Sequence, residues 1–352
     1  MEIYKETLRE IIKNGNQMHN KRTGITCYNA FGVGIMYDTG DKSPMPTIKE
    51  GYFTGAKVEL AWILKGLTNT DYLHQHKVHF WDKWRIVGNK PRSVEDVVYL
   101  YERRHGKGSV AKKLGDIEGI DFKELLVLLG MLNGPVLSHY YDDRDQMVDE
   151  IQCGDLGPVY GKMLREFPNP NGTTTDQLKL LIDGLISNPS SRRHVVSLWC
   201  PFYLPDESIS PQENVLRGKM ALAPCHFMWT FHVEDNHPKD LMEERYTLNL
   251  HFNMRSNDYA VGNPVNVVFY DLLLALVAQT VGMKKGKMWF TGTNVHVYSD
   301  QLLEAKVLLG RDPLPLPTLM LDKKATVFNF EPHMATLVNY KHRGRVSIKV
   351  AK

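Results

Sequence analysis

Hydrophobic positions along this chain recur with both helical and strand spacing. Leu8, Ile11 and Ile12 mark one face of a helix predicted at residues 4–14. The same pattern predicts further helices at residues 56–66, 176–187, 264–282 and 299–309. Strands are predicted at residues 25–37, 194–200, 226–233, 246–254 and 286–290. Helices and strands in mixed order indicate an α+β or mixed α/β domain.

Two stretches depart from the ordinary amphipathic pattern. Residues 264–282 are apolar on nearly every face, which predicts a helix buried on all sides. Residues 85–150 are instead rich in charge, with one amphipathic helix near residues 122–132. We interpret this region as a variable insertion, at about residues 85–150, in one domain that spans residues 1–352.

The composition is that of an ordinary globular protein. The chain has 352 residues, of which 43% are hydrophobic and 24% charged. The net charge of +3 is too small to favour a nucleic-acid or membrane partner. The first residues are charged with no apolar leader, and we expect no apolar run to be long enough to span a bilayer. We expect a cytoplasmic protein, in the host cytoplasm if its gene is viral.

One cysteine has a setting that suggests chemistry. The chain has four: Cys27, Cys153, Cys200 and Cys225. They are too sparse for a disulfide scaffold and lack metal-ligand spacing, so we expect no metal. Cys225 lies where a Pro turn meets the strand 226–233, with His226 beside it. A partly exposed cysteine near positive charge is a nucleophile, whereas a buried one merely packs, and this segment alone leaves both readings open.

Several polar residues suggest a phosphorylated ligand. Arg192 and Arg193 are adjacent, and Arg255 is followed by Ser256 at a strand end. Guanidinium groups with a hydroxyl suit a phosphate dianion, although adjacent arginines are often only solvated surface. Asn266 opens the buried helix, where it either caps the helix or presents a carboxamide to a pyrimidine edge.

His296 and Tyr298 are two residues apart in an extended segment, so their side chains point to one face. They form either an ordinary strand pair or a joint site for a sugar hydroxyl.

Taken in order, these motifs resemble those of the thymidylate synthase family. The early ones are KRTG at 21–24, VELAW at 58–62 and FWDKW at 80–84. GDLGPVYG at 154–161, SRR at 191–193 and ALAPCH at 221–226 follow. The last are RS at 255–256 with Asp258, GNPVN at 262–266 and HVY at 296–298. The resemblance omits only about residues 85–150. It implies a mixed, twisted sheet with long buried helices and an obligate homodimer through the sheet.

The family transfers a one-carbon unit from 5,10-methylenetetrahydrofolate to C5 of a pyrimidine nucleotide. By resemblance, Cys225 attacks C6 of the base. The other implied catalytic residues are Glu59, Tyr160, His226 and Asn266. The implied phosphate and sugar contacts are Arg22, Arg255, Ser256, His296 and Tyr298, with Arg192 and Arg193 donated by the second subunit. The implied folate contacts are Lys49, Trp81, Asp258 and Gly262.

Three positions depart from the synthase pattern and bear on the product. Met254 stands where synthases usually carry Gln, Asn257 follows Ser256, and the sequence ends in Lys352 rather than a small apolar residue. The run 253–258 resembles deoxycytidylate hydroxymethylases, in which water instead of hydride completes the reaction. Cytosine-specific members carry Asp where Asn266 stands, so the resemblance implies dUMP as the substrate.

The combined interpretation is a dUMP hydroxymethylase, of the kind phages use to make modified DNA. Two alternatives stay open. One is a divergent thymidylate synthase that makes dTMP and dihydrofolate. The other is an inactive homologue that binds a nucleotide or RNA. Retention of Cys225 together with Arg22, Asn266 and His296 counts against the inactive homologue, because a silent protein has no need of the nucleophile.

Overall fold

The chain folds into two compact units. The computed structural model describes residues 1–21, 23–86, 98, 101–102, 106–120, 124–125, 128, 137–138, 151–152, 154–236 and 245–350. The first unit comprises Met1–Leu67, Tyr160–Cys200 and Pro224–Lys352, and the second comprises Thr68–Val159 and Pro201–Ala223. Arg22, Cys153 and Lys352, and most of the helix expected near 122–132, lie outside the described residues.

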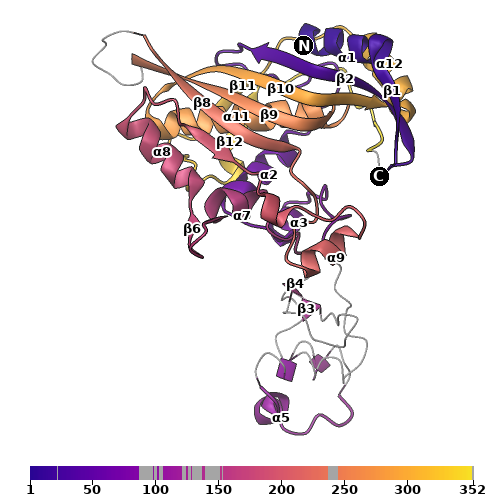
Figure 1. Cartoon of the computed structure of the whole chain (residues 1–352), viewed down its shortest axis with the longest axis vertical. Helices are drawn as coiled ribbons and strands as arrows, with labels where there is room; N and C mark the ends of the chain where they lie inside the picture. Colours follow the sequence, from indigo (N-terminus) through magenta and orange to yellow (C-terminus); the bar gives the residue numbers. More distant parts are fainter. Residues whose placement is uncertain are drawn as a thin grey trace. The chain divides into compact units, whose positions relative to one another are not determined.

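A six-stranded mixed sheet forms the centre of the first unit (Figure 1). Its strands, in spatial order, are β1 (Asn16–Asn20), β2 (Ile25–Tyr37), β10 (Lys284–Tyr298), β9 (Tyr246–Asp258), β8 (His226–Asp235) and β7 (Val195–Ser197). The β9–β10 pair is parallel, and the other neighbours in this sheet are antiparallel. The mixed α+β class predicted from the sequence is confirmed.

Alternating burial explains why these segments form strands with one face on the core. In β9, Leu248, Leu250, Phe252 and Met254 are buried, whereas the residues between them are partly exposed. This period of two is the pattern of a sheet that packs on one side only. The other side therefore carries a second, more exposed row of side chains.

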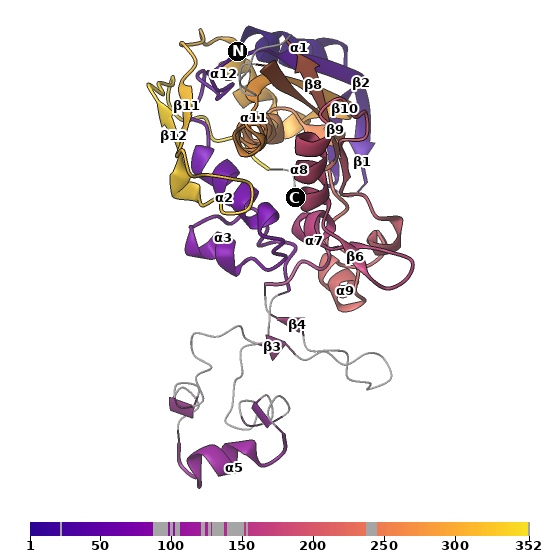
Figure 2. The ribbon, with the colours of Figure 1, turned by 90° about the vertical axis from the view of Figure 1, so that its left-hand side faces the viewer.

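Helices cover the core face of the sheet, as Figure 2 shows. The central one is α11 (Gly262–Val281), which packs on β9, β10 and the helix α2 (Phe53–Leu64). The helices α7 (Tyr160–Arg165) and α8 (Gln177–Ser187) extend this layer, and α1 (Glu2–Asn14) packs on β2, β10 and α12 (Leu302–Leu309). The remaining elements of this unit are β5 (Phe167–Pro168), β6 (Thr174–Thr175), η2 (Ser299–Gln301), β11 (Thr318–Leu321), η3 (Pro332–Met334) and β12 (Ala335–Val338).

The helix α11 corrects one expectation. By length and composition it is apolar enough to cross a membrane, although we expected no such stretch. Most of its residues are buried against the sheet and α2, as its all-round apolar pattern predicted. A core helix passes the same length and composition test.

Strand register brings the predicted motifs to one end of the sheet. The strand β8 begins at His226, which pairs with Met254 of β9 across a register shift, so Cys225 lies directly beside Arg255. In the neighbouring parallel pair, His296 of β10 lies opposite Asp258 of β9. Three adjacent strands therefore deliver candidate residues from three distant parts of the sequence.

The second unit contains short elements. They are α3 (Asp71–Gln75), α5 (Ser109–Leu114), β3 (Leu137–Ser138), β4 (Ile151–Gln152), η1 (Pro201–Tyr203) and α9 (Pro211–Leu216). Gln212 of α9 donates hydrogen bonds to the carbonyls of Lys83 and Arg85, at 3.0 and 3.2 Å. A small apolar cluster around Val110 and Leu125 lies within the region interpreted as an insertion.

Candidate active site

Cys225 differs from the other described cysteines in exposure. It is partly exposed, whereas Cys27 and Cys200 are buried. Its backbone N–H donates to the Tyr160 hydroxyl at 2.9 Å, and its carbonyl accepts from the Arg255 N–H at 2.9 Å. The Nε–H of Arg255 also donates to the carbonyl of Pro224 at 2.9 Å. A partly exposed thiol on a braced turn beside a guanidinium is the setting of a nucleophile rather than of a packing residue.

The next residue, His226, is buried and held as a neutral imidazole. Its Nδ1 lies 2.6 Å from the Tyr270 hydroxyl, which also accepts the Nε1–H of Trp229 at 2.6 Å. The Tyr270 hydroxyl has one proton and two lone pairs, so its contact with Nδ1 suits either neutral tautomer of His226. Burial lowers the pKa of His226 to about 3. The ring stacks on Tyr160, with centroids 4.4 Å apart.

Tyr160, which stacks on His226, is also close enough to Glu59 to interact with it electrostatically. Burial raises the pKa of Tyr160 well above its usual value, and the neighbouring Cys225 and Glu59 add to the rise. Tyr160 is therefore a neutral phenol at pH 7. Glu59 is 9% exposed within the apolar helix α2, where a carboxylate is costly unless it has polar partners.

Two amides and a thioether lie in contact near the start of α11. Asn257 is buried, and its Nδ2 lies 3.1 Å from the Met254 Sδ and 3.5 Å from the Asn266 Oδ1. The Oδ1 of Asn257 is buried with no hydrogen-bond partner among the described residues. Such an orphan acceptor is a place for an ordered water or a ligand donor. A side chain at Gly262 would make only ordinary contact with Asn266.

Asp258 occupies a buried polar network. Its Oδ2 accepts from the Gln301 Nε2 at 2.9 Å, and its Oδ1 accepts from the Val261 N–H at 3.2 Å. Burial raises the pKa of Asp258 to about 6, although these hydrogen bonds and the charge of Lys49 oppose the rise. Burial likewise lowers the pKa of Lys49 to about 8, and its Nζ donates to the Ala260 carbonyl at 3.1 Å.

Gln301 was not found by sequence reasoning, yet it connects three parts of this region. Besides Asp258, its Nε2 donates to the Lys349 carbonyl at 2.9 Å, and its Oε1 accepts from the Tyr298 N–H at 3.1 Å. The one local signal was its position three residues after Tyr298, which is the spacing of a capping box. Tyr270 was also missed, because its partners His226 and Trp229 are more than 40 residues away in the sequence.

His296 and Tyr298 lie side by side at the end of β10. Their rings are 5.0 Å apart in an edge-to-face arrangement, and both are buried. The Nδ1 of His296 lies 2.8 Å from the Asn294 Oδ1, and its backbone carbonyl accepts from the Tyr259 N–H at 2.8 Å. The pair is thus fixed next to Asp258 and Ser256, which occupy the adjacent strand.

Of the other predicted residues, two are exposed on the first unit, one lies outside the described residues and one belongs to the second unit. Arg192 and Arg193 are exposed just before β7. Arg22 lies outside the described residues. Trp81 belongs to the second unit, where it is buried edge-to-face against Trp84 with ring centroids 5.8 Å apart.

Comparison with known proteins points to a single family. The family model described as thymidylate synthase matches residues 2–352. A thymidylate synthase of Francisella philomiragia is 30% identical over 352 residues, which cover the whole of both chains. A thymidylate synthase of Francisella tularensis subsp. holarctica is 29% identical over the same complete span.

The neutral imidazole of His226 predicts a pH-dependent contribution to stability. Because burial lowers its pKa from 6.5 to about 3, the unfolded chain takes up a proton as the pH falls below 6.5, whereas the folded chain does not. Between pH 7 and 5 this group should remove about 2 kcal/mol from the free energy of unfolding. In His226→Gln the loss over that interval should be smaller by about 2 kcal/mol, measured by urea unfolding.

The exposed His19 offers a matched control for this measurement. His19→Gln should keep the pH dependence of the wild type. Equal pH dependence in the wild type and His226→Gln would show that His226 is not held neutral.

Proposed function

Because the chain belongs to the thymidylate synthase family, we propose that it transfers a one-carbon unit to C5 of dUMP through an adduct between Cys225 and C6 of the base. The family's co-substrate, 5,10-methylenetetrahydrofolate, supplies the carbon. The observation that carries the proposal is the partly exposed Cys225, braced by Tyr160 and Arg255 beside a buried neutral His226. An inactive binding protein has no need of this arrangement.

The residues near Asp258 suit the pterin ring of the folate. Gln301 and Val261 donate hydrogen bonds to separate oxygens of the carboxylate, and the backbone of Ala260 also hydrogen-bonds to it. A carboxylate has about four lone-pair sites, so about one remains for an N–H group of a pterin. With a pKa of about 6, Asp258 is mostly ionised at pH 7 and accepts such donors. Lys49 and the tail residue Lys349 hold the surrounding backbone in place.

In the proposed reaction, the Cys225 thiolate adds to C6 and the electrons of the C5–C6 double bond make C5 nucleophilic. The methylene carbon of the folate bonds to C5. Loss of the C5 proton then breaks the bond between this carbon and the folate nitrogen, which releases tetrahydrofolate and leaves an exocyclic methylene on C5. Glu59 and Tyr160 organise the polar groups near O4 of the base. Asn266 accepts from N3–H and donates to O4, which complements uracil and not cytosine. Arg255 and Ser256 bind the phosphate together with Arg22, and His296 and Tyr298 bind the 3′-hydroxyl.

We propose that water completes the reaction and gives 5-hydroxymethyl-dUMP, a precursor for modified phage DNA. Asn257 supports this choice, because its Nδ2 contacts Asn266 and its buried Oδ1, which has no partner among the described residues, can hold a water. That water attacks the exocyclic methylene carbon, a C–O bond forms, and its proton is lost. The electron pair returns to the ring and expels the Cys225 thiolate. Met254, in place of the usual Gln, adds no polar group that would hold this water elsewhere.

A second outcome is reduction of the same intermediate by hydride from the folate, which gives dTMP and dihydrofolate. The observation that favours it is the name thymidylate synthase borne by the similar Francisella proteins. Both outcomes share every step up to the exocyclic methylene. We also propose that the reaction takes place in the cytoplasm.

The sheet supports a proposed homodimer. Val195, Thr230, His251, Trp289 and Met36 form one row across five strands on the face away from α11. The apolar members Val195, Trp289 and Met36 are 45%, 43% and 53% exposed. Such a patch on a sheet face marks an interface. Arg193 and Arg192 lie two and three residues before Val195, so a partner on this face is within their reach.

The product of the wild-type protein tests the proposed final step. With dUMP and methylenetetrahydrofolate we expect 5-hydroxymethyl-dUMP and no rise in dihydrofolate absorbance, whereas dCMP should give no product. Asn257→Leu, which removes the acceptor but keeps the volume, should lower the yield of hydroxymethyl product about 10-fold or more. Products are identified by chromatography and mass spectrometry.

Stoichiometric dTMP and dihydrofolate from the wild type would reject water as the final reactant but keep the one-carbon transfer. Formation of neither product would reject the proposed function itself.

Mixing of inactive variants tests the donation of arginines between subunits. Arg192→Ala/Arg193→Ala and Cys225→Ser should each be nearly inactive. After subunit exchange in an equal mixture, half of the dimers combine one chain of each kind, and one of their two sites is intact. We expect recovery of about a quarter of the wild-type activity in steady-state assays. No recovery, with exchange verified by mass spectrometry, would show that the arginines serve their own subunit.

A further inference from the structure

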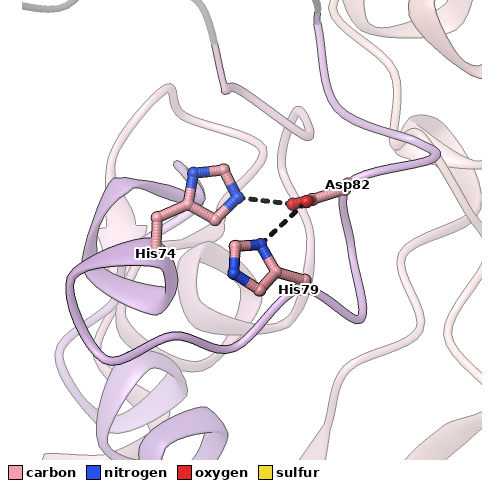
Figure 3. A group of neighbouring side chains, drawn as sticks. All are labelled: His74, His79 and Asp82. Atoms are coloured by element: carbon pink, nitrogen blue, oxygen red, sulfur yellow. Dashed lines mark hydrogen bonds and ion pairs between the residues drawn. The ribbon is translucent and has the colours of Figure 1, made fainter.

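Three side chains of the second unit converge on one another (Figure 3). His74 lies in α3, and His79 and Asp82 follow within the next eight residues. The Nε2 of His74 contacts the Asp82 Oδ1, and the Nδ1 of His79 lies 2.9 Å from the Asp82 Oδ2. The potential ligand atoms of all three residues lie within 4.8 Å of one another.

We propose that His74, His79 and Asp82 form a binding site for a divalent transition metal ion, with zinc as the best-suited ion. Two imidazole nitrogens and one carboxylate oxygen are the ligand set of zinc sites that keep an open coordination position for water. The same set, on one side of the ion, also suits ferrous iron. The proposal departs from the sequence-based expectation of no metal, which was argued from the cysteines.

The backbone between the ligands holds them in position. Lys77 adopts a left-handed conformation, with φ 59°, which a non-glycine residue maintains only where its surroundings enforce it. Leu73 and Val78, both fully or nearly buried, anchor this turn, and the Val78 N–H donates to the Leu73 carbonyl at 2.9 Å. The reversal of the chain at Lys77 brings the rings of His74 and His79 into a stack, with their centroids 5.0 Å apart.

Two nearby charges act on a cation at this cluster in opposite directions. The carboxylate of Asp82, ionised at neutral pH as aspartates ordinarily are, attracts a cation, whereas the guanidinium of Arg85 repels one. Arg85 Nε lies 3.7 Å from the Asp82 Oδ1 and orients the carboxylate from outside the ligand set. The positive charge of Arg85 opposes the binding of a cation. Both histidines are therefore needed as ligands.

Binding requires a change of tautomer but no net loss of protons from neutral imidazoles. Each histidine nitrogen that faces Asp82 must present its lone pair to the ion. The ring proton then resides on Nδ1 of His74 and on Nε2 of His79. His79 is 60% exposed, so its outer nitrogen reaches water. Exposure also leaves room for the open coordination position.

Titration of the metal-free full-length protein tests this site. We expect calorimetry to show one Zn²⁺ per chain, and Co²⁺ to give the visible absorption bands of a low-symmetry, four- or five-coordinate ion. His79→Ala and Asp82→Asn should each weaken zinc binding at least about 10-fold. His76→Ala is the matched control, because its Nδ1 faces the Tyr72 carbonyl at 2.9 Å and takes no part in the cluster.

Cysteine thiols also bind zinc, so the titrations are repeated in Cys225→Ser, where stoichiometry and affinity should be unchanged. Because the proposed one-carbon transfer needs Cys225, zinc binding by Cys225→Ser is measured independently of that reaction. Absence of zinc binding by the wild type would overturn the proposal, as would equal binding by the wild type, His79→Ala and Asp82→Asn. An equal loss of affinity in His76→Ala would reject the ligand assignment. Circular dichroism verifies that each variant is folded.

Discussion

The pairing of β8 with β9 is the constraint on which the candidate active site depends. It aligns the start of one strand with the end of the other, so that the Arg255 N–H and side chain both bind the backbone at Pro224 and Cys225. The register shift after His226 turns that side chain toward Tyr270 in the core. Side chains alternate between the two faces of a sheet along each strand. A shift of the β8–β9 register by one residue would therefore place these side chains on the opposite face of the sheet.

Buried hydrogen bonds fix the chemistry of this site more than its charges do. Tyr270 joins His226 to Trp229, and Gln301 joins Asp258 to the C-terminal tail. Buried polar groups cost free energy unless they are paired, so a network of this kind survives only where each member has a partner. Among the described residues, the buried Asn257 Oδ1 is one acceptor without a partner, and it supports our proposal that water completes the reaction.

The sequence predicted the apolar elements well and the polar ones poorly. The strand expected at 25–37 matches β2, and the buried helix expected at 264–282 matches α11 within two residues. By contrast, β1 was missed because its residues Asn16–Asn20 are almost all polar, and β10 extends well beyond the predicted 286–290 through a polar run. Backbone hydrogen bonds to a neighbouring strand stabilise such polar segments. A hydrophobic pattern in the sequence does not reveal these hydrogen bonds.

The same limit applies to individual residues. Motifs identified Cys225 and Asp258, but Tyr270 and Gln301 act through partners more than 40 residues away. Asp82 lies within the FWDKW motif and His74 lies six residues before it, yet only the turn at Lys77 shows that they converge.

The most direct test of the central claim is release of tritium from dUMP labelled at C5. Addition of the Cys225 thiolate to C6 is what makes loss of the C5 proton possible, so the wild type with methylenetetrahydrofolate should release tritium whichever product forms. Cys225→Ser should bind dUMP and release none. Equal release by the variant, or binding without release by the wild type, would contradict the assignment of Cys225 as the nucleophile.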